Sequence, residues 1–70
     1  MNVKFHFDND ISTEYEELEV DYPAGAMIPR KGEIVLHVSP ALGEERQYEI
    51  NTVMHDYLVP GEVLIYARLK

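Results

Sequence analysis

The first candidate for chemistry is a run of oxygen-bearing residues near the N-terminus. Calcium-binding EF-hand loops place oxygen ligands at their first, third, fifth and twelfth positions, and here Asp8, Asp10, Ser12 and Glu19 have that spacing. The sixth position of such a loop requires glycine for a sharp turn, whereas this chain has Thr13. No amphipathic helix flanks the segment on either side. We therefore expect a solvated turn capped by its own carboxylates, and no metal site.

The three histidines offer a second route to a metal or acid–base site. His6, His37 and His55 are far apart in the sequence and lack the short loop or helical spacing of zinc ligands. His55 is followed by Asp56, but neighbouring residues of a strand point to opposite faces, so the two form no dyad unless a turn folds them together. We expect all three histidines on the surface.

Nucleophiles and paired carboxylates give no catalytic pattern either. The chain has no cysteine, no serine in a nucleophile elbow and no glycine-rich phosphate loop after a strand. Adjacent carboxylates occur only at Glu16-Glu17 and Glu44-Glu45. Such neighbours diverge on a strand and are solvated in a loop. We predict a protein that is not an enzyme and has no cofactor.

The elements available to position these side chains are strands. Alternating apolar and polar residues, rich in β-branched and aromatic types, predict half-buried strands with turn residues between them. The predicted strands are Val3–Phe7, Glu14–Asp21, Glu33–Val38, Tyr48–Met54 and Val63–Leu69. The last two form an antiparallel hairpin around the turn at Pro60-Gly61. Five short strands predict an all-β, five-stranded and partly open barrel, with no helix longer than about two turns.

Three details of these strands are less regular. The apolar residues of the second and fourth strands are out of phase, which favours bulges near Glu16-Glu17 and at Asn51-Thr52. Ser12–Leu18 also resembles a capped helix start, although its thin apolar face favours the strand. In the third strand Ile34, Leu36 and Val38 share one face, and Val35 and His37 form the minor face.

Composition narrows the class further. Seventy residues predict a single domain spanning residues 1–70. Met1–Asp10 has no apolar core of a signal peptide, and no run approaches the length of a membrane span. We expect a cytoplasmic protein without membrane contact. The net charge of −7 opposes phosphate binding, so we expect no nucleic-acid partner.

Two stretches carry a resemblance to a known group. Ile28-Pro29-Arg30-Lys31-Gly32-Glu33-Ile34-Val35 resembles the start of a strand in SH3-like small barrels, and Tyr48–Val53 resembles their bent central strand. Together they cover about residues 28–69. The resemblance is to small uncharacterised SH3-like β-barrel proteins of bacteria and their phages or mobile elements. It implies a barrel and carries over no catalytic residue.

Exposed apolar residues favour a non-enzymatic protein-interaction or assembly module. Tyr57, Leu58, Leu64 and Tyr66 are expected to lie outside the core near the last strand, and tyrosine is enriched in interfaces. The partner is not identified by the sequence. Self-association into a homodimer is a further expectation, because Val63–Leu69 would be a poorly protected strand if it lay at an edge.

The alternative function is an acidic decoy or inhibitor. Seven carboxylates without a base cluster between residues 8 and 21 and would face a basic protein surface. These residues are Asp8, Asp10, Glu14, Glu16, Glu17, Glu19 and Asp21.

Overall fold

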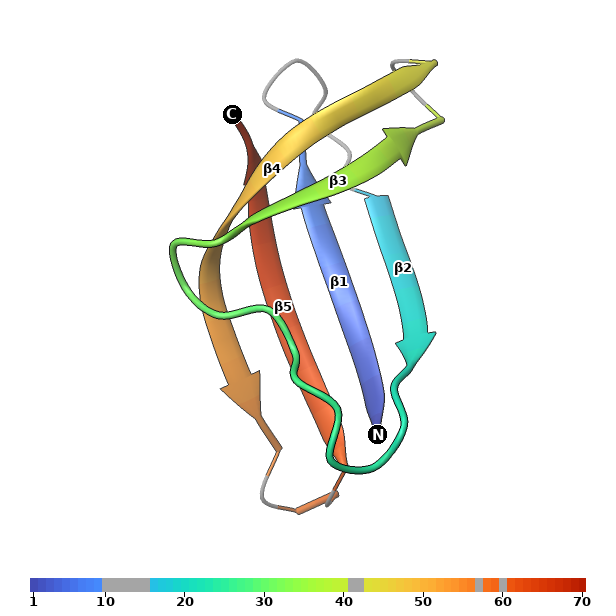
Figure 1. Cartoon of the computed structure of the whole chain (residues 1–70), viewed down its shortest axis with the longest axis vertical. Coiled ribbons are helices and arrows are strands. Elements are labelled where there is room, and N and C mark those ends of the chain that lie inside the picture. The colour runs from blue at the N-terminus through green and yellow to red at the C-terminus, as the bar shows by residue number, and fades with distance from the viewer. Residues whose placement is uncertain (10–15, 41–42, 57, 60) are drawn as a thin grey trace.

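The protein is a single curled sheet of five strands (Figure 1). The computed structural model describes residues 1–9, 16–40, 43–56, 58–59 and 61–70. The strands are β1 (Asn2–Asp8), β2 (Glu16–Asp21), β3 (Ile34–Ser39), β4 (Glu44–His55) and β5 (Glu62–Leu69). The predicted all-β, five-stranded and partly open barrel is confirmed as a half-barrel. Over the described residues no helix is long and apolar enough to cross a membrane.

The strand order is β2-β1-β5-β4-β3. β1 pairs antiparallel with β2, and β3, β4 and β5 follow one another as antiparallel neighbours. The two halves join through a parallel pairing of β1 with β5, so the first and last strands lie side by side in the middle of the sheet. The predicted β4–β5 hairpin is confirmed. Its turn contains Gly61 at φ +89°, a conformation that glycine adopts without strain.

The position of β5 corrects the expectation of an exposed C-terminal edge. β5 pairs with β1 on one side and with β4 on the other, so its backbone is not available to a second copy. Val63, Ile65 and Ala67 are buried on its inner face. The parallel contact with β1 covers the edge that sequence alone left open. The exposed edges of the sheet are instead β2 and β3.

The core is built from alternate residues of the three central strands. Side chains of β1, β4 and β5 on the inner face are almost completely removed from solvent. These residues are Val3, Phe5, Phe7, Tyr48, Ile50, Val63, Ile65 and Ala67. Such alternation is the direct consequence of the two-residue period of a strand with one face covered.

A bulge in β4 curls the sheet. The pairing of β4 with β5 shifts register between Ile50 and Thr52, which confirms the bulge predicted at Asn51-Thr52. An extra residue bends its strand and increases the local twist. The first half of β4, together with β3, therefore crosses in front of β5 and β1 (Figure 1).

The expectation that His37 lies on the surface was wrong, because β3 turns this residue toward the inner face of the sheet. Val35 lies opposite Tyr48 in the β3–β4 pairing, and directly paired residues share a face of the sheet. Because Tyr48 is fully buried, this register turns Val35 and His37 inward. Leu36 then faces outward. The sequence of β3 taken alone suggested the opposite, since its other face is more apolar.

β2 corrects one further detail. It pairs regularly with β1 from Glu16 onward, with Glu16 opposite Phe7 and Glu17 opposite His6. The predicted bulge near Glu16-Glu17 is therefore wrong. Glu16–Leu18 is strand and not helix. The first part of the alternative helix, residues 12–15, lies outside the described residues.

Candidate functional site

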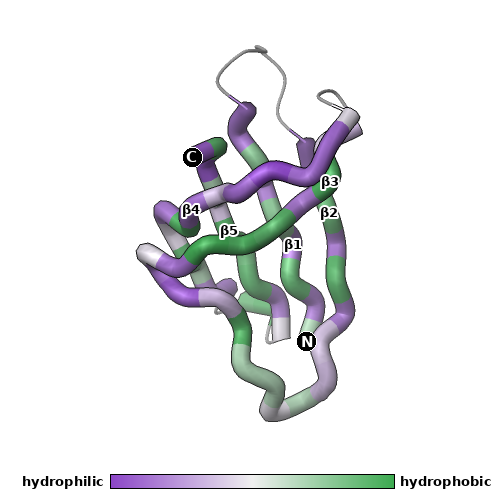
Figure 2. Tube along the Cα trace, turned by 45° about the horizontal axis from the view of Figure 1, so that its top comes forward, coloured by the Kyte–Doolittle hydropathy of each residue, from purple (hydrophilic) through white to green (hydrophobic). Residues whose placement is uncertain are grey.

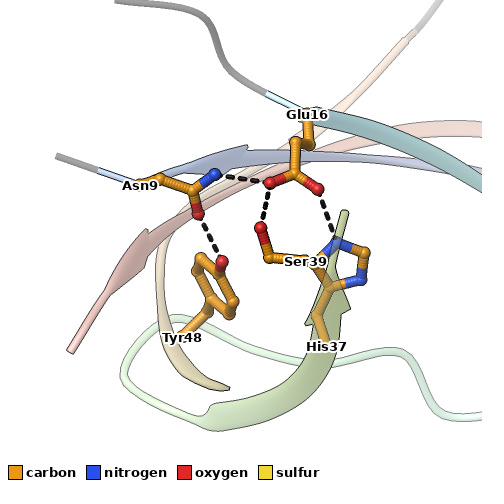
Figure 3. A network of polar contacts seen from close by, with 5 residues as sticks. All are labelled: Asn9, Glu16, His37, Ser39 and Tyr48. Carbon is orange, nitrogen blue, oxygen red and sulfur yellow. Dashed lines mark hydrogen bonds and ion pairs between the residues drawn. The ribbon is translucent and has the colours of Figure 1, made fainter. Parts of the chain in front are cut away.

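The open side of the half-barrel lies between its two edge strands, β2 and β3. Among the described strands, β2 pairs only with β1, and β3 pairs only with β4. At one end of this opening Glu16 of β2 contacts His37 and Ser39 of β3. Figure 3 shows these side chains meeting across the opening, together with Asn9 and Tyr48. We call the five residues Asn9, Glu16, His37, Ser39 and Tyr48 the polar clamp.

The carboxylate of Glu16 is the centre of the polar clamp (Figure 3). Its Oε1 accepts a hydrogen bond from Asn9 Nδ2 at 2.5 Å and another from Ser39 Oγ. Its Oε2 lies 3.3 Å from His37 Nε2. Tyr48 donates its hydroxyl proton to Asn9 Oδ1. One carboxylate thus links β2, β3 and the residue that follows β1, with Tyr48 of β4 supporting that residue.

The alternation of the strands brings the clamp residues together. Glu16 lies opposite the buried Phe7, so it shares the inner face of the sheet. Asn9 continues the inward positions of β1, and Ser39 continues those of β3. Asn9 and Ser39 are both completely buried. Buried polar groups of this kind are stable only with partners, and they have them here.

Aromatic rings of the core pack against the His37 and Tyr48 side chains of the clamp. The ring of His37 stacks on Phe7 with centroids 4.0 Å apart and an angle of 6° between the ring planes. Tyr48 packs against the same two rings at larger angles. These contacts fix the imidazole and the phenol where they meet the Glu16 and Asn9 side chains.

The clamp stabilises the ionised form of Glu16. Burial by itself would raise the pKa of this carboxyl group. Hydrogen bonds from Ser39, Asn9 and His37, with the electrostatic attraction of His37, outweigh that effect and place the pKa below its ordinary value of 4.5. At Tyr48 the net shift has the opposite direction. Burial, with help from the Glu16 charge, raises the pKa of the phenol above its ordinary value of 10.0.

The polar clamp links the edge strands β2 and β3 through side-chain contacts. A serine, a histidine and a carboxylate occur together, but both Ser39 and His37 contact Glu16. An activated serine instead gives its proton to a histidine that a carboxylate orients. Ser39 is also completely buried. The geometry therefore suits cross-strand attachment better than nucleophilic attack.

Beside the clamp the opening widens into a cleft. Its volume is about 430 Å³. It runs between the inner faces of β2 and β3 over the sheet behind them. The inward residues that line it are Phe5, Phe7, Leu18, Val20, Tyr22, Val35 and His37, and Leu36 of the edge strand β3 also contributes. The cleft is therefore mainly apolar, and Leu18 remains 42% exposed in it.

The outer face of β3 carries a second apolar feature. Ile34, Leu36 and Val38 are 40%, 62% and 61% exposed; we call these three residues the apolar stripe. In Figure 2 β3 is mostly in the hydrophobic colour, while the neighbouring first half of β4 is hydrophilic. Glu45 and Glu49 of β4 lie opposite Val38 and Ile34. The stripe thus has carboxylates along one side.

The predicted interaction residues near β5 are only partly gathered on one surface. Leu64 is 38% exposed on the outer face, and Tyr66 packs against the His6 ring at a centroid distance of 4.8 Å. Leu58 is 92% exposed in the β4–β5 turn. Tyr57 lies outside the described residues.

The predicted acidic surface is smaller than the sequence suggests. Glu16 turns inward into the clamp, so its assignment to the acidic surface was wrong. Asp8, Glu17, Glu19 and Asp21 are exposed. Asp10 and Glu14 lie outside the described residues.

The first and last residues of the EF-hand spacing, Asp8 and Glu19, do not lie together. Glu19 lies opposite Lys4 and forms an ion pair with it at 3.5 Å, whereas Asp8 is at the far end of β1. Asp10 and Ser12 lie outside the described residues. The part of the chain that the structure describes contains no cluster of three metal-binding side chains.

One histidine belongs to the polar clamp and two lie nearer the surface. His37 belongs to the clamp, with 13% of its side chain exposed. His6 lies on the outer face beside Tyr66, and His55 is exposed. Sequence reasoning missed Asn9 and Ser39. For Asn9 the signal was the inward alternation of Val3, Phe5 and Phe7, which continues to it. Ser39 is recognised only once the register with β4 turns Val35 and His37 inward.

Comparison of the chain with protein-family models, curated proteins and solved structures found no match.

Proposed function

We propose that the protein is a non-enzymatic interaction module that binds an extended segment of a protein partner along β3. The observation that carries the proposal is an edge strand with the apolar stripe on its outer face. β3 pairs with β4 on one side and with no described strand on the other. Extended peptides bind such strands by adding to the sheet, with backbone hydrogen bonds for affinity and side-chain pockets for specificity.

The two edges of the sheet differ in how they are protected. β2 presents the exposed charges of Glu17, Glu19 and Asp21, and charge is a common means of preventing unwanted strand pairing. β3 has no proline and no Asp, Glu, Lys or Arg. An unprotected edge with exposed aliphatic residues is favourable for a partner strand and costly to leave in water.

The resemblance to SH3-like small barrels agrees with this proposal. The Pro29-Arg30-Lys31-Gly32 turn leads directly into β3, and Gly32 has φ +90° there. Glu33 N–H donates to the Arg30 carbonyl within the turn. A cytoplasmic location, and a partner that is neither nucleic acid nor membrane, belong to the same proposal.

Affinity capture with matched variants tests the function. The bait is the whole protein, wild type or with Leu36→Lys in the apolar stripe, incubated with lysate of the source organism. Leu58→Lys adds the same charge at a more exposed position, 92% against 62%, in the β4–β5 turn. We expect proteins retained by wild type and by Leu58→Lys to be lost with Leu36→Lys. Retention by Leu36→Lys would contradict the proposal, provided that circular dichroism shows all three proteins folded.

A second candidate is the acidic decoy. Glu17, Glu19 and Asp21 occupy alternate outward positions of β2 and form a row of exposed carboxylates. Capture of a basic partner by this row would weaken steeply between about 50 and about 300 mM salt, because exposed charges are screened over about 10 Å at 0.1 M. Binding along the apolar stripe of β3 would be less sensitive to salt.

A further inference from the structure

We propose that the segment bound along β3 alternates aliphatic residues with lysine or arginine, its aliphatic residues entering the cleft and its basic residues lying over the apolar stripe. The inference rests on the proposed function, because it takes β3 as the docking strand. It adds the chemistry of the partner, which follows from the two faces of that strand.

The inner face selects aliphatic side chains. A strand added beside β3 continues the sheet, so its inward residues lie next to Val35, over the cleft. The cleft is lined there by Phe5, Leu18 and Val20. A polar side chain placed among these residues would lose water without gaining a partner. An aliphatic side chain would instead bury apolar surface on both sides.

The polar clamp sets the register of the added strand. Glu16 already contacts His37 and Ser39 across the opening, so the inner side beside those residues is occupied. Val35, two residues before His37, lines the cleft. The inserted aliphatic residue is therefore expected next to Val35, and its neighbours in the bound segment point outward.

The outer face selects long basic side chains. The outward residues of an added strand would lie beside Leu36 and the rest of the apolar stripe, with Glu45 and Glu49 one strand further on. Lysine and arginine have aliphatic stems that cover apolar surface while the charged end reaches toward solvent or a carboxylate. Glu17 and Glu19 of β2 lie beyond the other side of the opening. The chain's net charge of −7 also disfavours an acidic segment.

A second copy of the chain meets these requirements poorly. β3 itself contains neither lysine nor arginine. Pairing β3 with β3 would place each copy's Glu45 and Glu49 along the outer side of the same interface. A basic segment of a different protein removes that repulsion and covers the stripe.

Defined peptides test the inference. Blocked peptides of about nine residues, the length of a long strand, alternate Val with Lys, Val with Glu, or Ser with Lys. Each is titrated into the isotope-labelled whole protein at about 0.15 M salt, where screening acts over about 8 Å. Amide chemical shifts report both the site and the affinity. We expect the Val–Lys peptide to shift the β3 amides and to bind at least about tenfold more tightly than either other peptide.

Two charge variants separate specific from general attraction. Glu45→Gln removes a carboxylate beside the stripe, and Glu62→Gln removes an exposed carboxylate of β5. Both change the net charge from −7 to about −6. We expect Glu45→Gln to weaken Val–Lys binding about threefold, which is typical of one exposed ion pair, and Glu62→Gln to leave it unchanged. Equal effects of the two variants would overturn the role of Glu45 and Glu49.

The remaining outcomes distinguish the inference from the proposed function. Equal binding of Val–Lys and Val–Glu at β3 overturns the basic chemistry and leaves strand addition standing. Equal binding of Ser–Lys, or shifts confined to β2, overturns the aliphatic insertion. A dimer in sedimentation that Leu36→Lys in β3 dissociates overturns the proposed basic partner too. If no peptide changes the chemical shifts of the β3 amides, the inference fails. The capture experiment with Leu36→Lys then tests the proposed function separately.

Discussion

Glu16→Gln is the most direct perturbation of the polar clamp. The substitution keeps the size of the side chain and an acceptor oxygen for Asn9 and Ser39, but it removes the negative charge. Hydrogen bonds to a charged group contribute about 1.5–3 kcal/mol each, against about 0.5–1.5 kcal/mol for neutral ones. Glu16 accepts two such bonds and lies 3.3 Å from His37. We expect the variant to lose about 2 kcal/mol of unfolding free energy.

That loss is large for a chain of this length. A change of 1 kcal/mol moves the melting temperature of a domain of about 60–100 residues by about 4–8 °C, so we expect a decrease of about 8–16 °C. Urea unfolding followed by circular dichroism measures the free energy directly. Glu17→Gln, one position along on the outer face, removes the same charge from an exposed side chain. It should change stability by less than about 0.5 kcal/mol.

The pH dependence provides an independent check. Because the pKa of Glu16 is lower in the folded state than its ordinary value of 4.5, the ionised carboxylate contributes its full stabilisation above that value. The contribution is lost as the pH falls through the folded-state pKa. A protonated Glu16 resembles glutamine, so wild type and Glu16→Gln should converge in acid. Equal stability of the Glu16 and Glu17 variants at neutral pH, or a difference that persists in acid, would refute the role assigned to the clamp.

Two further substitutions test the residues around the clamp and β3. Tyr48→Phe removes the donor to Asn9 and leaves a completely buried carbonyl oxygen without that partner, so we expect a loss of about 1–3 kcal/mol in urea unfolding; an unchanged midpoint would contradict this. Gly32→Ala meets no neighbouring atom within 4 Å but forces an L-residue to φ +90°, so its cost of about 1–2 kcal/mol is backbone strain alone. Lys31→Ala, beside it in the same turn, is the control, and equal melting temperatures for the two variants would argue against strain.

The strands could be predicted because their signals are local. The alternation in Val3–Phe7 and Val63–Leu69 is visible without any partner, and the bulge at Asn51-Thr52 follows from the phase of Ile50 and Val53. The strand order is not local. The parallel contact between β1 and β5 joins opposite ends of the chain, and no turn residue marks it. The edge expected at Val63–Leu69 was therefore assigned to the wrong strand.

The polar clamp could not be predicted from the sequence, because it too depends on contacts between strands. Glu16 reads as one of seven carboxylates in an acidic segment, and only its position opposite Phe7 turns it inward. Asn9 and Ser39 follow directly after apolar alternation, where a polar residue ordinarily indicates a turn. Burial of such residues depends on partners from other strands, which the sequence of one strand does not contain.

A single register connects the clamp with the surface proposed for binding. Val35 opposite Tyr48 places His37 and Ser39 inside, where they meet Glu16, and places the apolar stripe outside. Shifting β3 by one residue would exchange its faces. The stripe would then be buried, and the Glu16 carboxylate would lose His37 and Ser39. The hydrogen bonds of the clamp therefore favour the register that leaves aliphatic residues in water. In this way a polar contact inside the half-barrel stabilises the apolar outer face of β3, the strand proposed for docking.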